Sequence, residues 1–252
     1  LTPVVNTMEQ LDMIRARGID LPFSLHVDTG MNRLGLSADD VQKIADDPSR
    51  IEGLNMVQVL SHFACSDEKD HPLNALQAER FGRALTTIRR VTNPLIPATL
   101  ANSSGIFRSP AYHHDMVRPG FALYGGNPTP ETKNPMRAVV RLQSRILQVR
   151  MAQAGETVGY GATHKFDRTT TLITIGTGYA DGILRALSNK GAVVHWGDVP
   201  CTIVGRVSMD LISVALPRDD AGPSPQIGDL IDIIGPHKSV DDLATAAETI
   251  GY

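Results

Sequence analysis

Apolar and polar residues alternate in two different ways along the chain, and the first pattern covers the N-terminal half. Nearly continuous apolar segments at residues 23–27 and 55–63 predict strands that are buried on both faces. Helical spacing of apolar residues separates these strands, and one helix is expected to begin at Ser37, where Asp40 completes a capping box. A last strand is expected over residues 116–124. This order of strands and helices is typical of parallel βαβ units.

The second pattern begins after a proline-rich segment, residues 127–135. Apolar residues between 140 and 146 now alternate with arginine and glutamine, which is the period of a half-exposed antiparallel strand. Further strands are expected at 171–175, 193–196, 202–204, 212–215 and 230–234, and a final helix is expected from Ser239. We therefore predict a parallel α/β domain over residues 1–135 and a β-rich domain over residues 136–252.

The α/β domain contains only about four or five predicted strands. A complete (β/α)8 barrel needs eight parallel strands and about 250 residues, and an incomplete one leaves strand edges unpaired. We therefore interpret the fold class as α/β, with a partial (β/α)8 TIM barrel followed by a mainly-β C-terminal domain. The chain begins with Leu1 rather than Met, and we expect it to be an internal fragment of a longer protein.

Composition argues against several kinds of partner. The net charge is −3 and no long basic run occurs, so we expect no binding to nucleic acid. No apolar run is long enough to cross a bilayer and no signal-peptide pattern occurs, so we expect no membrane partner. Cys65 and Cys201 are too few for a disulfide framework, which favours a cytoplasmic protein.

Polar groups gather where the predicted parallel strands end, which is where functional residues lie in such folds. They are Arg33, His62, Ser103, Arg118 and a backbone run at Gly120. Ser103 and the N–H groups around Gly120 would suit a phosphate, and Arg118 with His62 would suit an aromatic nitrogen. Each residue alone has a structural interpretation, as a core histidine, a surface ion pair or a helix cap. Together they predict a cofactor that carries a phosphate.

Three corners flanked by glycine carry reactive side chains in the β-rich domain. They lie at residues 155–164, 178–182 and 205–210, and they include Tyr160, Tyr179 and Arg206. Glycine lets the backbone bend sharply and lets a ligand approach it closely. Each corner alone is typical of a hairpin turn with a packed tyrosine. A tyrosine beside an arginine can also act as a base, because a cation stabilises phenolate.

Seven short motifs occur in the same order as in bacterial alanine racemases. They are VDTGMNRLG (27–35), SHFA (61–64), ANS (101–103), VRPGFALYG (117–125), VGYGAT (158–163), GYADG (178–182) and VGRVSMD (204–210). The chain therefore resembles this family over nearly its whole length. The resemblance implies a fold-type III enzyme that depends on pyridoxal 5'-phosphate (PLP), racemises alanine and forms a homodimer with shared active sites. It also implies that the D-alanine serves peptidoglycan synthesis in the cell wall.

The resemblance assigns five residues to the cofactor: His62, Ser103, Arg118, Gly120 and Phe121. Arg118 would face the pyridine nitrogen. Because a guanidinium does not give up its proton, the ring nitrogen would stay neutral and the cofactor would be a weak electron sink, which limits side reactions. His62 would link Arg118 to the catalytic tyrosine, and the other three residues would hold the phosphate.

Further residues are assigned to the substrate by the same resemblance. Arg33 and the backbone of Met209 would contact its carboxylate, and Tyr160 would be a catalytic base that reaches into the partner subunit. Racemisation needs two opposed groups, because a single base tends to return the proton to its original face. Four residues would lie around the substrate entrance: Tyr179, Arg185, Arg206 and Asp210. The resemblance assigns no metal ligand.

Departures from the family pattern include a catalytic lysine and the residue that braces Arg33. The Schiff-base lysine, which would be the second base, is missing, because the six lysines of this chain lie in other contexts. The fragment alone is therefore expected to be inactive. His26 stands where many members have a carbamylated lysine that braces the arginine corresponding to Arg33. A bound anion or another side chain could brace Arg33 instead, or the brace could be dispensable.

Two other functions remain open. A racemase of another amino acid, such as serine, or of several amino acids would use a similar site, because one methylene group contributes only about 1–3 kcal/mol to discrimination. A non-catalytic PLP-binding protein is the second alternative, although it would not need the β-rich domain with Tyr160.

Overall fold

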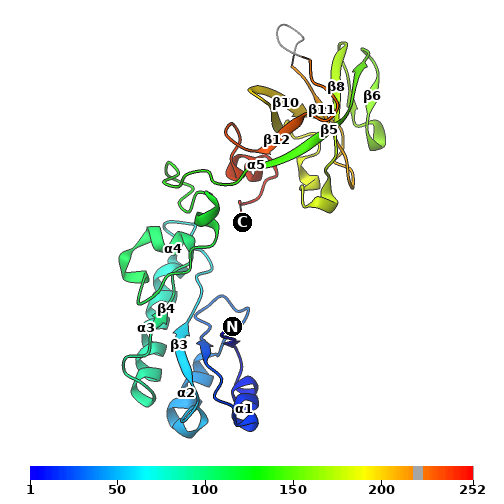
Figure 1. Ribbon diagram of the computed structural model, residues 1–252. Helices are drawn as coiled ribbons and strands as arrows, with labels where there is room; N and C mark the ends of the chain where they lie inside the picture. The colour runs from blue at the N-terminus through cyan, green and yellow to red at the C-terminus, as the bar shows by residue number, and fades with distance from the viewer. Residues whose placement is uncertain (218–223, 252) are drawn as a thin grey trace. The chain divides into compact units, whose positions relative to one another are not determined.

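The computed structural model describes residues 1–217 and 224–251, and the chain divides into two compact units (Figure 1). Unit 1 consists of Leu1–Ala122 and Pro128–Pro135, and unit 2 consists of Leu123–Asn127 and the residues from Met136 onward. Residues 218–223 and 252, which belong to the predicted β-rich domain, lie outside the described residues.

Unit 1 contains a four-stranded parallel sheet in the order β1-β2-β3-β4. The strands are β1 (Val4–Val5), β2 (Phe23–His26), β3 (Met56–Leu60) and β4 (Ala98–Thr99). The helices are α1 (Met8–Arg17), α2 (Ala38–Asp46), α3 (Pro72–Val91) and α4 (Ser103–Arg108), with short 3₁₀ helices η1 (Pro48–Arg50) and η2 (Pro110–Tyr112). One helix follows each strand, as the βαβ pattern predicts.

The core of unit 1 joins this sheet to its helices. Its central side chains are fully buried and come from β2, β3 and α3: Phe23, Leu25, Val59, Phe81 and Ile88. The predicted capping box at the start of α2 is confirmed, because Ser37 Oγ accepts from the Asp40 N–H at 3.1 Å and the Asp40 carboxylate accepts from the Ser37 N–H at 3.3 Å.

The predicted strand over residues 116–124 is wrong. Met116 makes a single parallel bridge to Thr99, and the segment then turns into the 3₁₀ helix η3 (Phe121–Tyr124). Pro119 has no N–H to donate to a ladder. The N–H groups of Gly120 and Ala122 donate to the Ser103 hydroxyl instead of to a strand. An apolar run alone does not distinguish a β-strand from a turn followed by a 3₁₀ helix.

Unit 2 contains a closed antiparallel barrel in the strand order β10-β11-β8-β5-β12-β9. Its strands are β5 (Leu142–Ala152), β8 (Thr170–Ile175), β9 (Val193–Trp196), β10 (Val199–Ile203), β11 (Ile212–Ala215) and β12 (Leu230–Ile234). A small hairpin of β6 (Thr157–Val158) and β7 (His164–Lys165) and the helix α5 (Val240–Ala246) complete the unit, with 3₁₀ helices η4 (Tyr160–Ala162), η5 (Tyr179–Asp181) and η6 (Arg185–Leu187). Isoleucine and valine side chains from the strands fill the barrel, including the fully buried Ile173, Ile175 and Val214.

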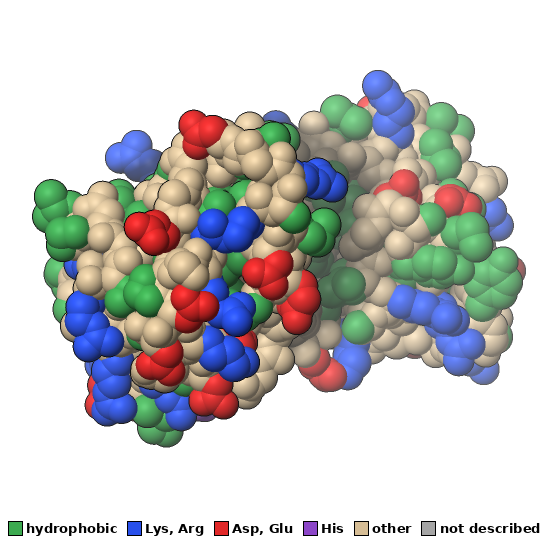
Figure 2. Space-filling view, turned by 90° about the horizontal axis from the view of Figure 1, so that it is seen from below, with side chains coloured by type: hydrophobic (Ala, Val, Ile, Leu, Met, Phe, Trp, Pro, Cys, Tyr) green, Lys and Arg blue, Asp and Glu red, His purple; other side chains and the backbone are tan. Residues whose placement is uncertain are grey.

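The two units together confirm the predicted order of a parallel α/β part followed by a β-rich part. Among the described residues, no helix combines the length and the apolar character that crossing a bilayer requires. Figure 2 shows acidic and basic side chains interspersed over the face that it presents.

Candidate functional site

Arg118 is the most firmly held of the predicted site residues. Its Nη1 donates to Thr99 Oγ1 at 2.6 Å, and its Nη2 donates to the carbonyl oxygens of Ser61 and Leu100, the latter at 3.3 Å. These acceptors lie at the ends of β3 and β4 and just beyond them. Burial lowers the pKa of Arg118, whereas the surrounding acceptors stabilise the protonated guanidinium. The charge therefore has a fixed position at this end of the sheet.

His62 lies directly against that guanidinium. Its Nδ1 is 3.4 Å from Arg118 Nη2, and because arginine can only donate, Nδ1 must be the acceptor and Nε2 carries the ring proton. Burial, together with the charges of Arg118 and Arg33, lowers the pKa of His62 to about 4. His62 is therefore neutral near pH 7 and offers one N–H donor.

This pKa shift predicts how the stability of unit 1 depends on pH. Between pH 6.5 and about 4 the unfolded chain binds a proton at His62 that the folded chain does not, so stability should fall as the pH drops through this window. Urea unfolding above the window and at its lower end measures the difference. The variant His62→Gln should show a shallower decline, and an unchanged decline would mean that other groups control it.

Ser103 organises the turn that contains Gly120. Its hydroxyl oxygen accepts from the N–H groups of Gly120 at 3.0 Å and Ala122 at 3.1 Å, and the side chain is buried. The N-cap of α4 is Asn102, whose Oδ1 accepts from the Gly105 N–H at 3.0 Å. Ser103 is therefore not the helix cap, and its own O–H remains as a donor. No atom lies within 4 Å of the position that a Cβ of Gly120 would take, so the turn is open there.

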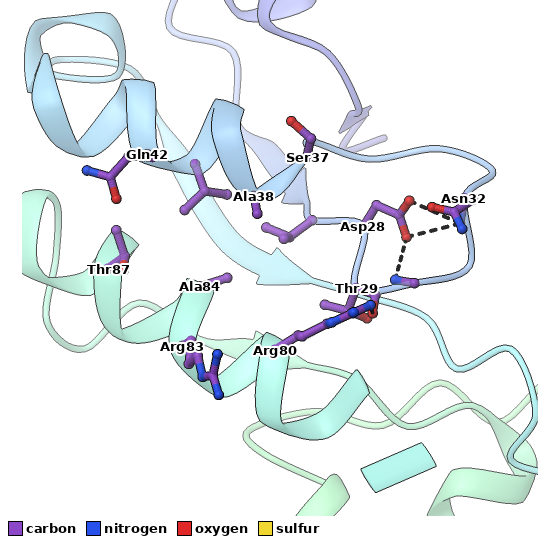
Figure 3. Close-up of a pocket in the computed structure, with 13 residues that line it drawn as sticks. Asp28, Thr29, Asn32, Ser37, Ala38, Gln42, Arg80, Arg83, Ala84 and Thr87 are labelled. Atoms are coloured by element: carbon purple, nitrogen blue, oxygen red, sulfur yellow. Dashed lines mark hydrogen bonds between the residues drawn. The ribbon is translucent and has the colours of Figure 1, made fainter. Parts of the chain in front are cut away.

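Asp28, two residues beyond the end of β2, holds the loop that carries Arg33. Its carboxylate accepts from the N–H groups of Gly30 at 2.9 Å and Asn32 at 3.0 Å (Figure 3). It also accepts from the N–H of Met31 at 2.9 Å. Asn32 adopts the left-handed φ of 55° that this turn requires. No role was predicted for Asp28 from the sequence, although an aspartate between a strand and Thr-Gly is typical of such a turn.

A cavity of about 450 Å³ lies beside this loop, between α2 and α3 (Figure 3). Thr29 and Arg80 are among the residues that line it, and Arg80 Nη1 donates to the Thr29 carbonyl oxygen at 3.2 Å. None of the predicted cofactor residues lines this cavity. We therefore do not assign it to the cofactor.

His26 is bound by Asn6, a residue that the sequence analysis missed. The parallel pairing of β1 with β2 places Asn6 beside His26, and His26 Nδ1 lies 2.8 Å from Asn6 Oδ1. The Asn6 Nδ2 donates to the Val4 carbonyl oxygen at 3.1 Å, which fixes the amide orientation and makes His26 Nδ1 the donor. Burial, then the charge of Arg118, lowers the pKa of His26, so the neutral ring keeps an unprotonated Nε2.

The Tyr160 corner of unit 2 is formed by two glycines in left-handed conformations, Gly159 with φ 74° and Gly161 with φ 75°. The guanidinium of Arg206 lies so close that a Cβ on Gly161 would be 3.2 Å from its Nη1. Tyr160 itself is 72% exposed. The structure thus places the Arg206 guanidinium beside Gly161, next to Tyr160 in the chain.

The corner at Tyr179 is joined to the Met209 segment through the backbone. The Tyr179 N–H donates to the Ser208 carbonyl oxygen at 3.0 Å, and the Ala180 N–H donates to that of Met209 at 2.9 Å. The Arg185 guanidinium lies 5.9 Å from the centroid of the Tyr179 ring. Asp210 lies next to Met209 in the same exposed segment.

Gly178 allows this close approach, which leads to a prediction. A Cβ at this position would collide with the carbonyl oxygens of Ser208 and Met209. We expect Gly178→Ala to lower the free energy of unfolding by about 1–3 kcal/mol. Gly82→Ala is the matched control, because no atom lies within 4 Å of its Cβ position in α3 and helix propensity favours alanine. Equal stability of both variants in thermal unfolding would contradict the proposed collision.

Comparison with known proteins identifies the family. Residues 1–128 match the family described as "Alanine racemase, N-terminal domain", and residues 139–252 match "Alanine racemase, C-terminal domain". Alanine racemase of Rhodospirillum rubrum is 45% identical over 260 residues, which cover 100% of this chain and 67% of the relative. A catabolic alanine racemase of Mesorhizobium japonicum is 44% identical, with 100% of this chain and 65% of the relative covered.

Solved structures agree with these matches. The crystal structure of alanine racemase from Bartonella henselae, with covalently bound pyridoxal phosphate, superposes with a TM-score of 0.85 at 36% identity and covers 100% of this chain and 69% of that one. Alanine racemase from Streptomyces lavendulae gives a TM-score of 0.87 at 32% identity, with 99% and 68% covered. The chain spans roughly two thirds of the length of these relatives. It belongs to the alanine racemase family.

Proposed function

We propose that the protein containing this chain is a PLP-dependent racemase that interconverts L-alanine and D-alanine. Family membership supports the reaction, and the arrangement at the ends of β3 and β4 supports the cofactor. The activity is proposed for the whole protein, because this chain matches about two thirds of its relatives and contains no lysine in the motif that the family uses.

The residues of unit 1 fit PLP. The cofactor has a phosphate at one end of its ring and a pyridine nitrogen at the other. The Ser103 hydroxyl and the open turn at Gly120 and Phe121 would hold the phosphate. The fixed guanidinium of Arg118 would donate to the ring nitrogen. When bound, PLP makes the Cα–H of an attached amino acid acidic.

The electrostatics of Arg118 and His62 would restrict the reaction to racemisation. A guanidinium would donate a hydrogen bond to the ring nitrogen without transferring a proton to it. The ring nitrogen would therefore stay neutral. Neutral His62 offers its Nε2–H, and we propose that this group donates toward the phenol oxygen of Tyr160 of the partner subunit. Such a donor would stabilise the phenolate form in which a tyrosine acts as a base.

Tyr160 would move the proton at one face of the substrate Cα, and the Schiff-base lysine of the complete protein would move it at the other. Arg33 and the Met209 backbone would orient the substrate carboxylate. Positive charges attract a carboxylate, and Arg185 and Arg206 would therefore favour entry of the substrate. Tyr179 and Asp210 would lie around the same entrance. The 72% exposure of Tyr160 supports a role in the active site of a partner subunit in a homodimer.

The observation that carries this proposal is the guanidinium of Arg118, anchored by Thr99 and main-chain carbonyls beside a neutral histidine. The test is to follow enantiomer interconversion by the intact, PLP-loaded protein with alanine, serine and lysine. We expect alanine to react fastest in both directions. Faster reaction of serine would favour a racemase of another amino acid, and cofactor binding without any racemisation would favour a non-catalytic PLP-binding protein.

The physiological role is proposed separately. We propose that the D-alanine is used for peptidoglycan, and that the enzyme is cytoplasmic, which the free Cys65 and Cys201 of this chain support. A catabolic role is the second candidate, because the Mesorhizobium japonicum relative is named catabolic, whereas a Pseudomonas aeruginosa relative of known structure is named biosynthetic. A deletion strain that needs D-alanine for growth would support the first role, and one that fails only to use alanine as a nutrient would support the second.

A further inference from the structure

Three potential metal ligands meet in the loop between β3 and α3, outside the residues proposed for the cofactor and substrate. They are Cys65, Glu68 and His71, and their ligand atoms all lie within 4.8 Å of one another. The thiol and the imidazole are half-buried and the carboxylate is exposed. The family resemblance assigned no role to any of them.

The loop conformation brings these side chains together. The Glu68 N–H donates to the Cys65 carbonyl oxygen at 3.0 Å, and the His71 N–H donates to that of Glu68 at 3.3 Å. In the same way, the Asn74 N–H donates to the His71 carbonyl oxygen at 3.1 Å. Each of these hydrogen bonds joins residues three positions apart. Side chains with this spacing project from the same face of the loop.

Independent contacts hold this loop in place. Arg108 Nε donates to the Ser66 carbonyl oxygen at 2.7 Å, and its Nη2 donates to that of Asp67 at 2.6 Å. The Asn74 Nδ2 donates to the Glu68 carbonyl oxygen at 2.9 Å. A loop fixed between Arg108 and Asn74 loses little further entropy when its side chains bind an ion.

We infer that Cys65, Glu68 and His71 bind a divalent transition-metal ion of the zinc type, with water as the fourth ligand. A thiolate, an imidazole nitrogen and a carboxylate oxygen are the three ligand types that zinc takes from proteins, and three protein ligands leave a position for water. Burial and the negative charges of Glu68 and Asp67 raise the pKa of the Cys65 thiol, and a bound cation would reverse that effect.

A buried acceptor beside the cluster supports a bound water. Asn74 is 6% exposed, and its Oδ1 has no hydrogen-bond partner among the described residues. The same amide group contacts the Glu68 backbone through Nδ2. A metal-bound water has O–H groups to donate, and it would satisfy an acceptor that is costly to leave unpaired.

Metal binding would change the first turn of α3. His71 Nδ1 now accepts from the Leu73 N–H at 3.2 Å, so the neutral ring carries its proton on Nε2. Coordination through Nδ1 would take the lone pair that accepts this hydrogen bond, and coordination through Nε2 would leave the ring proton on Nδ1. Either mode would break the capping bond. The cap is long for a hydrogen bond, and Pro72 at the first helical position has no N–H to satisfy.

Cobalt(II) tests the site directly, because a Co–thiolate bond gives a near-ultraviolet charge-transfer band that other ligands do not give. The intact, PLP-loaded protein should show this band on titration with Co²⁺, and added Zn²⁺ should abolish it. Cys65→Ser should abolish the band, whereas the matched control Cys201→Ser, at a buried thiol, should retain it. A band that persists in Cys65→Ser, or no band in the unchanged protein, would overturn the inference.

Two further variants test the other ligands. His71→Asn removes the imidazole and keeps a side chain that caps helices well, and Glu68→Gln removes only the charge. Each should weaken Co²⁺ binding at least about tenfold. Zn²⁺ should raise the unfolding temperature of the unchanged protein but not of Cys65→Ser; an equal rise in both would place the zinc elsewhere. These readouts do not depend on racemase activity, so they remain informative if the proposed function is wrong.

Discussion

Replacing Tyr160 with phenylalanine in the intact protein should lower the rate of racemisation by about 10²–10⁴-fold, the usual contribution of a general acid or base. The substitution removes only the phenol oxygen, and the corner should persist because Gly159 and Gly161 set its backbone. The effect should be unequal for the two enantiomers. In D2O, exchange of the Cα proton should be lost for the enantiomer that Tyr160 deprotonates and should persist for the other.

Tyr124→Phe is the matched control for this experiment. Tyr124 is also an exposed tyrosine, with 65% of its surface accessible, and it has no proposed role in catalysis. We expect its racemisation rate to stay close to that of the unchanged protein. If Tyr160→Phe slowed exchange of both enantiomers equally, Tyr160 would not be one of two opposed bases.

The second large effect is expected for Arg118→Lys. Lysine keeps the positive charge, but a single ammonium group cannot reproduce the fork that binds Thr99 and the Ser61 and Leu100 carbonyl oxygens. We expect the turnover number to fall by about 10²–10³-fold, the cost of removing a preorganised donor from a reacting group. An ammonium can also transfer its proton to the ring nitrogen, so the yield of keto acid per racemisation event should rise.

A pair of substitutions at Thr99 tests whether catalysis depends on the position of the Arg118 guanidinium as well as on its charge. Thr99→Ser keeps the hydroxyl that accepts from Arg118 Nη1, and Thr99→Val removes it at nearly constant volume. We expect Thr99→Val to slow racemisation and Thr99→Ser to retain most of the activity. Equal activity of the two variants would mean that this hydrogen bond does not position the guanidinium. For Arg118→Lys, an unchanged yield of keto acid would mean that the ammonium does not transfer its proton to the ring nitrogen.

The division into a parallel α/β part and a β-rich part could be predicted because strands buried on both faces differ in pattern from half-exposed ones. Helix ends were also predictable where they depend on local chemistry, as at Ser37 and Asp40. The segment 116–124 was not, because its apolar residues suit a strand as well as a 3₁₀ helix. Its conformation depends on Ser103, a residue distant in sequence.

Prediction of the candidate site from the sequence was limited in the same way. The sequence motifs identified Arg118, His62 and Ser103, but not the residues that fix them in place. Thr99 binds Arg118 only because β4 lies beside the segment that begins at Met116. Asn6 reaches His26 only because of the register in which β1 pairs with β2. Such partners depend on tertiary pairing, which the spacing of residues along the chain does not specify.

The closed barrel of unit 2 has a consequence for amide hydrogen exchange. Each of its six strands has a neighbour on both sides, and β8 lies between β11 and β5. Amides of β8 should therefore be among the last to take up deuterium, because exchange from a strand that is paired on both sides requires opening of a large part of the structure.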